Sequence, residues 1–232
     1  MNFEIVPAYD VSLGEQTQVM NAAFANYIGG WTDQDAGAFA RFVVLQGTDL
    51  FYSRLIRADG ELVGFCYFGR TGNVPRCTGM GIVPAARGSG AANYLLDHVI
   101  DEAKQRGDAA MVLEVIQQNP RAHKLYRRSG FVETDELLGW RRTAGLPLAV
   151  RAWPEIEEVD LLQVLNTPND REYPQLPWQV TRHCAAKLPV ARAYRAGAAC
   201  VVLGNLADKR RACMHSSPAQ QTSRAGSSSA IC

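Results

Sequence analysis

The sequence lacks an excess of charge of either sign. Among its 232 residues, 24 Lys and Arg stand against 23 Asp and Glu, so the formal net charge at pH 7 is +1. Proteins that bind nucleic acid use an excess of basic residues to neutralise phosphates, so nucleic acid is not an expected partner. Hydrophobic residues at 47% and charged residues at 20% are typical of folded globular proteins rather than disordered or fibrous chains.

Long apolar runs are also missing. No stretch reaches the roughly 18 to 20 uninterrupted apolar residues that span a bilayer. The amino end, MNFEIVPAYD, contains no basic segment followed by an apolar run, which is the pattern of a secretory signal. The sequence therefore predicts a cytoplasmic protein without a membrane partner.

Motifs for metal and redox chemistry are absent as well. The 6 cysteines form no CxxC pair and the 4 histidines have no metal-ligand spacing, so we expect no metal site and mostly buried, reduced thiols. A nucleotide-triphosphate loop would need Gly-Lys followed by Ser or Thr, which the sequence does not contain. These absences direct attention to the glycine-bearing turns that are present.

Apolar periodicity and turn signals predict alternating strands and helices. A hairpin should turn at Asp59-Gly60, because both residues accept the backbone of a tight turn. Asn119 and Pro120 predict the N-cap and first residue of a helix. The expected strands are 3–8, 52–57, 61–68, 76–83, 110–116 and one from Phe131; the expected helices are one ending near 28, one opened by a capping box of Thr32 and Asp35, one at 91–106, and one after Asn119 that Gly130 closes.

The turn from a strand into a helix at 82–92, IVPAARGSGAA, is a signal for function. Such a turn exposes the first amides of the helix, which form an anion site together with the helix dipole. Gly88 and Gly90 allow close approach of the backbone, and Arg87 can add a charge-assisted contact to phosphate. A dinucleotide fingerprint read from Gly88 fails, because position 93 holds Asn93. A phosphate-bearing cofactor is implied, although a plain turn with glycines for geometry explains the same residues.

A second motif follows at 119–131, NPRAHKLYRRSGF. The two patterns, V-x-P-x-x-R-G-x-G-x-A and then N-x-x-A-x-x-L-Y-x-x-x-G-F, resemble those of the GNAT acetyltransferase superfamily, over about residues 3–143. The resemblance implies an α/β fold of the mixed α+β kind, in which helices flank a twisted, mostly antiparallel mixed sheet. It also implies that acetyl-CoA lies where the fourth and fifth strands splay apart.

The resemblance further implies which residues hold the cofactor. The turn would bind the pyrophosphate through its amides, the end of the fourth strand would pair with the pantetheine arm, and the Asn of the second motif would contact the cofactor. A helix cap alone also accounts for that Asn. The cofactor-binding residues expected on this basis are Ile82, Val83, Arg87, Gly88, Ser89, Gly90, Ala91, Ala92 and Asn119.

Tyr126 corresponds to the family's general acid, which protonates the departing thiolate. A core aromatic residue on the apolar face of its helix is the alternative interpretation. Phenol and thiol have ordinary pKa values of about 10 and about 8.5. Proton donation therefore requires that the site stabilises the developing phenolate or that the transfer is concerted.

The sequence has no carboxylate at 76–80, RCTGM, where members of the family often carry a Glu that takes the proton of the acceptor. An amine with a pKa of about 10 is mostly protonated at pH 7, so a base is needed. Glu114 on the next strand is the candidate, and an ion-paired or solvated carboxylate, or a chain of waters, is the alternative. Phe24, Tyr27 and Trp31 predict an aromatic-lined acceptor pocket, although core packing explains the first two equally well.

These features predict an N-acetyltransferase that moves the acetyl group of acetyl-CoA directly to an amine of a small molecule or peptide. A non-catalytic acyl-CoA-binding sensor or regulatory module is the alternative, because the Glu of the fourth strand is missing. Retention of Tyr126 favours the enzyme. The fold and cofactor site do not specify the acceptor.

The second half of the chain echoes the first. The segment 163–166, QVLN, repeats 18–21, QVMN, and 148–153 resembles 3–8 at the same offset. We therefore expect either a degenerate, partial second unit of the same fold after residue 143, without cofactor residues, or an unrelated appendage.

The echo sets the expected domains. A catalytic domain should span 1–143, a partial unit 144–207, and a disordered tail 208–232, which is rich in Ser, Lys, Arg and Gln. A unit that ends early should expose a strand edge at 192–204. Such an edge templates association between copies of the chain, as a homodimer or an aggregate.

Overall fold

The computed structural model describes residues 1–31, 33–137, 155–166, 178, 181–188, 192–196, 199–203 and 213–216. The chain forms two compact units, with a boundary between Gly139 and Trp140. Among the helices in these ranges, none is both long enough and apolar enough to cross a membrane.

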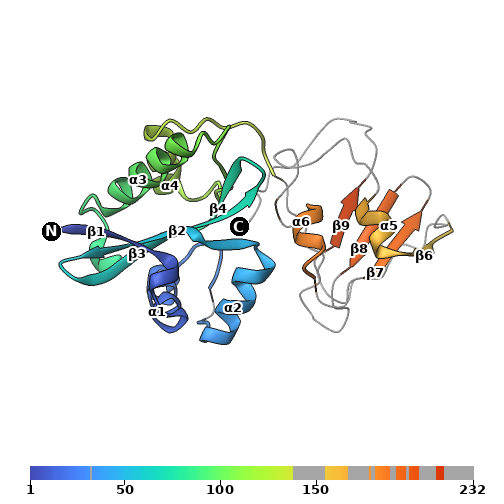
Figure 1. The fold of residues 1–232 in the computed structure, drawn as a ribbon, viewed down its shortest axis with the longest axis horizontal. Coiled ribbons are helices and arrows are strands. Elements are labelled where there is room, and N and C mark those ends of the chain that lie inside the picture. The colour runs from blue at the N-terminus through green and yellow to red at the C-terminus, as the bar shows by residue number, and fades with distance from the viewer. Residues whose placement is uncertain are drawn as a thin grey trace. The chain divides into compact units, whose positions relative to one another are not determined.

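The first unit is a five-stranded sheet in the order β1-β2-β3-β4-β5 with helices on both faces (Figure 1). Neighbouring strands are antiparallel, except that β4 and β5 are parallel. This arrangement confirms the predicted fold class. Its elements are β1 (Phe3–Pro7), η1 (Ala8–Asp10), α1 (Leu13–Phe24), α2 (Ala36–Leu45), β2 (Thr48–Ala58), β3 (Glu61–Thr71), β4 (Val74–Ile82), η2 (Pro84–Ala86), α3 (Ala91–Arg106), β5 (Val112–Leu113) and α4 (Pro120–Arg128).

The hairpin between β2 and β3 turns where the sequence predicts. Asp59 and Gly60 have φ angles of 49° and 91°, and a two-residue hairpin loop of this kind requires positive φ at both positions. Asp tolerates that region and Gly adopts it freely, so Ala58 pairs directly with Glu61 across the turn. The Asp59 carboxylate also accepts a 2.9 Å hydrogen bond from the N–H of Asn2, which ties the turn to the start of the chain.

Helices α3 and α4 begin and end at the predicted residues. Gly107 ends α3 with a φ of 73°, the left-handed conformation that glycine favours after a helix. The Asn119 side chain caps α4 by accepting a 3.2 Å hydrogen bond from the N–H of Ala122. Pro120 fills the first position of α4, where a missing N–H costs nothing.

The first two helices differ from the prediction at their ends. Ser12 and Glu15 form a capping box that opens α1, a signal that the sequence analysis overlooked, and α1 ends at Phe24 rather than near residue 28. Asp35 is the N-cap of α2 rather than the third residue of a capping box, and its carboxylate accepts a 2.6 Å hydrogen bond from the N–H of Ala38. Thr32, the predicted cap, lies outside the described residues.

Two predicted strands are also corrected. In place of the strand expected at 110–116, the structure has the shorter β5, Val112–Leu113. Only these two residues pair with β4. No strand occupies 131–137 within the described residues.

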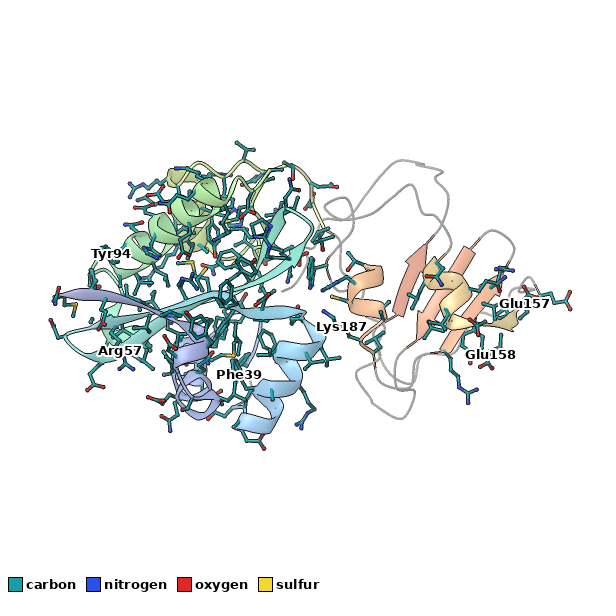
Figure 2. All side chains as sticks on the ribbon, in the orientation of Figure 1. Phe39, Arg57, Tyr94, Glu157, Glu158 and Lys187 are labelled. Atoms are coloured by element: carbon teal, nitrogen blue, oxygen red, sulfur yellow. The ribbon has the colours of Figure 1, made fainter. Side chains whose placement is uncertain are left out.

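The sheet separates two apolar clusters. Successive residues of a strand point to opposite faces, and Ile56 and Cys66 accordingly join one cluster while Leu55 and Phe65 join the other. The first cluster includes Leu95, Leu96 and Val99 of α3. The second includes Val19, Met20 and the fully buried Phe39 of the α1 and α2 side (Figure 2).

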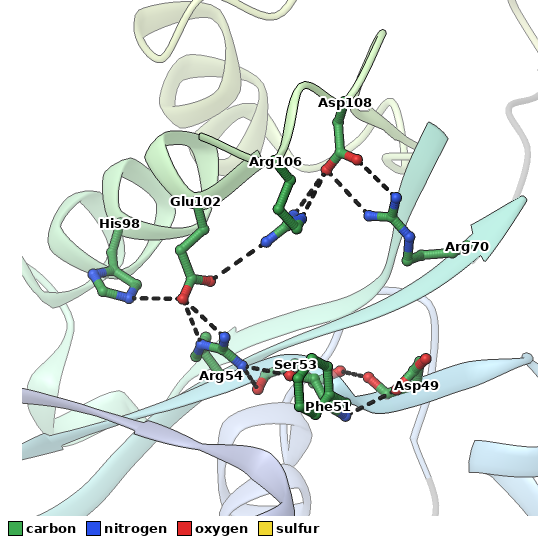
Figure 3. A network of polar contacts seen from close by, with 9 residues as sticks. All are labelled: Asp49, Phe51, Ser53, Arg54, Arg70, His98, Glu102, Arg106 and Asp108. Atoms are coloured by element: carbon green, nitrogen blue, oxygen red, sulfur yellow. Dashed lines mark hydrogen bonds and ion pairs between the residues drawn. The ribbon is translucent and has the colours of Figure 1, made fainter. Parts of the chain in front are cut away.

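A polar network joins α3 to the sheet (Figure 3). Arg54 of β2 donates to the Glu102 carboxylate at 2.8 Å, and Arg70 of β3 donates to the Asp108 carboxylate at 2.7 Å. Arg106 donates to Asp108 as well. Because α3 begins at the predicted cofactor turn, these contacts hold the helix that carries the turn.

The second unit contains a four-stranded antiparallel sheet in the order β6-β7-β8-β9. Ala185 and Ala193 lie in its small core, against Val159, Val164 and Leu188. Its elements are β6 (Glu157–Val159), α5 (Leu161–Asn166), α6 (Arg182–Ala185), β7 (Arg192–Ala196), β8 (Ala199–Leu203) and β9 (Cys213–Ser216).

The expectations for this half meet different outcomes. The predicted strand 148–153 lies outside the described residues. The prediction of an exposed strand edge at 192–204 is wrong. Strands β7 and β8 each have a neighbouring strand on both sides, and the outer strands of the sheet are β6 and β9. Strand β9 falls within the stretch 208–232 expected to be disordered, and the rest of that stretch lies outside the described residues.

Candidate active site

Strands β4 and β5 separate soon after they meet. Arg76 pairs with Val112 and Cys77 with Leu113; β5 then ends, while β4 continues to Ile82. The register between β3 and β4 shifts at the same level, the sign of a β-bulge, which bends a strand and increases its twist. Within the described residues, the far part of β4 therefore has a strand on one side only.

A cavity of about 790 Å³ lies along this part of β4. Its volume is within the range of about 300–1,000 Å³ that small-molecule and cofactor pockets have. The end of α1, the strand β4, the turn into α3, and α4 all contribute to the lining. The lining residues are Ala23, Phe24, Asn26, Tyr27, Ile28, Met80, Gly81, Ile82, Ala86, Arg87, Gly88, Gly90, Ala92, Asn93, Gln118, Asn119, Arg121, Ala122, Lys124, Leu125 and Arg128.

The turn before α3 has the geometry of an anion site. Gly88 and Gly90 have φ angles of 83° and 97°, and a Cβ built on either would meet no atom within 4 Å. The Ser89 hydroxyl donates to the Ala86 carbonyl at 2.7 Å and accepts from the N–H of Ala91 at 3.3 Å. The following amides of the first turn have no acceptor within the helix, so they and the helix dipole favour an anion in the open space.

Arg87 is held mainly by backbone carbonyls. Its Nε donates to the Ile82 carbonyl at 3.1 Å and its Nη2 to the Ala23 carbonyl at 2.8 Å. The guanidinium thereby links the end of β4 to α1 and also lines the cavity. A guanidinium has five N–H donors, so donors remain for a ligand.

Ile82 and Val83, the two residues expected to pair with pantetheine, differ in whether their backbone N–H can face the cavity. Val83 donates its N–H to the Val63 carbonyl at 2.9 Å, which directs this amide toward β3 and away from the cavity. Backbone groups of alternate residues point to opposite sides of a strand, so the N–H groups of Met80 and Ile82 point to the side without a strand. Ile82 lines the cavity, and so does Met80, which the sequence analysis did not single out.

Tyr126 lies behind Met80. Its hydroxyl is 4.0 Å from the Met80 sulfur, and its ring packs edge-on against Phe131 with centroids 5.8 Å apart. Tyr126 is half-buried against the cluster on the α3 side. The residue is not part of the cavity lining, so the structure places its hydroxyl one side chain away from the cavity.

Glu114 forms an ion pair with Arg76. Arg76 Nη2 lies 3.1 Å from Glu114 Oε2, and the two side chains are only 1% and 12% exposed. Arg76 also donates to the Gln46 side chain at 3.5 Å. Glu114 is outside the cavity lining, so the ion-paired alternative to a general base matches what the structure shows.

The predicted acceptor aromatics form a continuous row. Phe24 packs against Tyr27 and Trp31, with ring centroids 4.9 Å and 5.0 Å apart, but only Phe24 and Tyr27 line the cavity. The Trp31 Nε1 donates to the Asn21 side-chain carbonyl at 3.1 Å, and the same Asn21 amide exchanges hydrogen bonds with the backbone of Gln34. Asn21, which the sequence analysis missed, therefore fixes the loop that carries Tyr27.

Residues 17–131 match the family described as Acetyltransferase (GNAT) family. Residues 17–131 belong to this family. The matched range contains β4, the turn, Asn119 and Tyr126, the residues on which the predicted resemblance depends. The family uses acetyl-CoA as its acetyl donor, so the predicted family and cofactor are confirmed for these residues.

The chain is similar to three known proteins, one by sequence and two by structure. The streptothricin acetyltransferase of Streptomyces lavendulae is 36% identical over 78 residues, 33% of this chain and 41% of that protein, so the match spans about two fifths of that relative's length. The ribosomal-protein-S18-alanine N-acetyltransferase from Escherichia coli has a TM-score of 0.51 at 21% identity, covering 62% of this chain and 86% of that chain. An N-acetyltransferase from Staphylococcus aureus Mu50 has a TM-score of 0.50 at 21% identity, covering 59% and 87%. The two structures share the fold.

The residues present fit acetyl-CoA. The turn offers open space in front of two left-handed glycines and a helix start whose first amides have no acceptor within the helix, as a pyrophosphate requires. The free side of β4 offers backbone amides to a pantetheine arm. The cavity runs along both features, so one elongated molecule can reach them together.

Proposed function

We propose that this protein transfers the acetyl group of acetyl-CoA directly to an amine of a small molecule or peptide. The observation that carries the proposal is the cavity along the free side of β4, which reaches from the glycine turn to Met80, the neighbour of the Tyr126 hydroxyl. The proposed acceptor is an amine because two of the three reported relatives, those from Escherichia coli and Staphylococcus aureus Mu50, are N-acetyltransferases by name.

In this proposal the chain binds and orients the donor before any chemistry occurs. When bound, acetyl-CoA supplies a thioester whose acetyl carbon an amine can attack. The turn holds the pyrophosphate and the free side of β4 orients the arm, so the reacting groups are held in position, which is a main source of catalysis in direct transfer. The proposed cofactor-binding residues are Ile82, Arg87, Gly88, Ser89, Gly90, Ala91, Ala92 and Asn119. Val83, which the sequence also predicts, donates its amide to Val63 instead.

Tyr126 is the proposed general acid, because its hydroxyl is close to the cavity wall at Met80. A donor at this place can give a proton to the leaving thiolate. Glu114 remains the predicted base from sequence, but its ion pair with Arg76 favours the other interpretation, in which water takes the proton of the acceptor amine. Phe24 and Tyr27 form the proposed acceptor wall, and Trp31 supports it by packing against Phe24.

The experiment that tests the proposal is an acceptor screen with acetyl-CoA. Polyamines, amino acids, amino sugars and peptides are each incubated with the protein, and free thiol and the mass of the acceptor are measured. We expect thiol release that depends on one acceptor class, with a mass gain of one acetyl group. Thiol release that no amine increases above hydrolysis would contradict the proposal.

A second candidate is an acyl-CoA-binding sensor without turnover. It is favoured by one observation: none of the described residues that line the cavity is Asp or Glu, so no carboxylate is there to activate an amine. A sensor would bind CoA in a calorimeter and give no acetylated product in the screen.

We also propose that the region after residue 143 is a partial, degenerate second unit of the same fold. In support, its elements follow the order strand, helix, helix, strand, strand, strand, as β1 to β4 with α1 and α2 do. Both sheets then have these strands in sequential, antiparallel order. The domains proposed from the sequence are 1–143, 144–207 and a tail at 208–232. Because β9 pairs with β8, we extend the second unit to include Cys213–Ser216, and we propose no cofactor site in it.

A further inference from the structure

The face of α4 that lines the cavity is basic. Arg121, Lys124 and Arg128 all line the cavity, and their spacing of i, i+3 and i+7 puts them on one face of the helix. With Arg87 in the turn, the described lining has four cations and no carboxylate. The three residues of α4 are called the basic strip below.

The fold does not use the basic strip. Within the described part of the chain, none of the ion pairs includes Arg121, Lys124 or Arg128, whereas their neighbour Arg127, outside the lining, pairs with Glu133. Like charges three and four residues apart repel one another. A row of cations that faces a cavity without a counterion therefore points to an anionic ligand group.

The donor has two anionic groups in separate places. Its pyrophosphate suits the turn, because amides at a helix start and left-handed glycines form a cradle for a group that comes close to the backbone. The phosphate on the ribose is a monoester with about −1.5 to −2 charge at pH 7. Such a group suits long cationic side chains, which approach it through charge-assisted hydrogen bonds.

We propose that Arg121, Lys124 and Arg128 form a subsite for the ribose 3′-phosphate of CoA. The inference rests on the proposed function, since it assumes that CoA occupies the cavity. Its consequence is donor selectivity: the protein takes thioesters of CoA and discriminates against thioesters of 3′-dephospho-CoA, which lack only this phosphate. Because the basic strip is exposed, salt screens its attraction, and the selectivity decreases as ionic strength rises.

The test measures the dissociation constants of CoA and 3′-dephospho-CoA with the full chain by calorimetry. We expect the wild-type protein to bind CoA about tenfold more tightly than 3′-dephospho-CoA at low salt. The variant Arg121→Gln/Lys124→Gln/Arg128→Gln should bind the two compounds alike. Arg127→Gln is the matched control, since it removes one cation from the same helix outside the lining, and it should keep the preference.

The outcomes separate this inference from the proposed function. Equal binding of the two compounds by the wild-type protein overturns the subsite and leaves the proposed function standing; this comparison needs no variant. A triple variant that keeps the preference also overturns the subsite. If the wild-type protein binds neither compound, the proposed function fails and the subsite fails with it.

Discussion

At Gly90, a pair of substitutions can separate the effect of adding a side chain from the effect of adding a negative charge. Gly90 has a φ of 97°, and a Cβ there would meet no atom within 4 Å. A side chain therefore costs backbone strain rather than a clash. Asn and Asp have nearly the same shape and both tolerate positive φ better than most residues, so a comparison of the two isolates the effect of the charge.

We expect Gly90→Asp to bind CoA about tenfold more weakly than Gly90→Asn, because the carboxylate repels the pyrophosphate at the helix start. Calorimetry with CoA measures the difference, and thermal unfolding shows that both variants fold. Equal dissociation constants for the two variants would remove the phosphate role of the turn.

Tyr126→Phe tests whether Tyr126 is the general acid. The substitution keeps the ring that packs against Phe131 and deletes the hydroxyl near Met80. We expect turnover to fall about a hundredfold, as for loss of a general acid, while CoA affinity and the melting temperature stay close to wild type. Tyr9→Phe, at an exposed tyrosine outside the lining, is the control. A parallel loss of stability and turnover would support the packing interpretation instead.

Glu114→Gln tests whether the carboxylate is a base or a structural partner. Arg76 is 1% exposed, and a buried ion that loses its partner costs about 3 to 5 kcal/mol of stability. We expect Glu114→Gln and Arg76→Met each to lower the free energy of unfolding, and the double variant Arg76→Met/Glu114→Leu to recover part of it. The acid limb of the pH profile of turnover should persist in Glu114→Gln. Its disappearance would make Glu114 the base that the sequence predicts.

The Arg76–Glu114 pair also shows the limit of reading residues from sequence. Gly88, Gly90 and Asn119 were identified because each acts through its own backbone or through the next few residues. Arg76 and Glu114 lie 38 residues apart in the chain, and only the parallel contact of β4 with β5 brings them together. The sequence shows that the fourth strand has no Glu, but it does not show that Arg76 of that strand pairs with Glu114.

At the scale of elements, the C-terminal end of α3 is held to the sheet by the carboxylate of Asp108. Asp108 follows this helix, and its side chain is 3% exposed between Arg70 and Arg106 (Figure 3). The hydrogen bonds from Arg70, and then those from Arg106, lower the pKa of the Asp108 carboxyl below its ordinary value. A lowered pKa contributes stability that is present above the ordinary value and is lost as pH falls through the lowered one.

We therefore expect the wild-type protein to lose part of its free energy of unfolding as pH falls below about 4. Asp108→Asn should be less stable at pH 7, and the difference from wild type should shrink as pH falls below the ordinary carboxyl value of about 4 and through the lowered pKa of Asp108. Urea unfolding at several pH values measures it. Asp101→Asn, at an exposed carboxylate of α3, is the control. A difference that does not change with pH would assign the effect to shape rather than charge.

Element ends were predictable where a local signal set them. The Asp59-Gly60 turn and the Asn119-Pro120 cap were identified because each needs a residue type at one position. β5 was overestimated at 110–116, since an apolar run does not tell how far a neighbouring strand stays paired. α2 begins after Asp35, whose carboxylate accepts from the N–H of Ala38; Asp is a stronger N-cap than Thr, which favours this start over one at Thr32.

For the whole molecule, the sequence indicates repetition but not its register. QVLN lies in α5, Leu161–Asn166, as QVMN lies in α1. The first strand of the second sheet among the described residues is β6, Glu157–Val159, and the predicted strand 148–153 lies outside them. Loop lengths can change between two copies while the order of elements persists. The recurrence of that order in the second sheet is therefore stronger support for a partial copy than the offset of a few matching residues.

The last prediction concerns what the second unit contributes. All described residues that line the cavity fall within the range from Ala23 to Arg128, and the first unit extends to Gly139. A protein that ends at Gly139 should therefore fold and bind CoA with the affinity of the full chain, because its two apolar clusters and its phosphate turn are intact. Calorimetry with CoA and circular dichroism test this, with the full chain as the control. A truncated protein that is folded but no longer binds CoA would place part of the donor site in the second unit, whereas unchanged binding with reduced acetyl transfer would place acceptor contacts there.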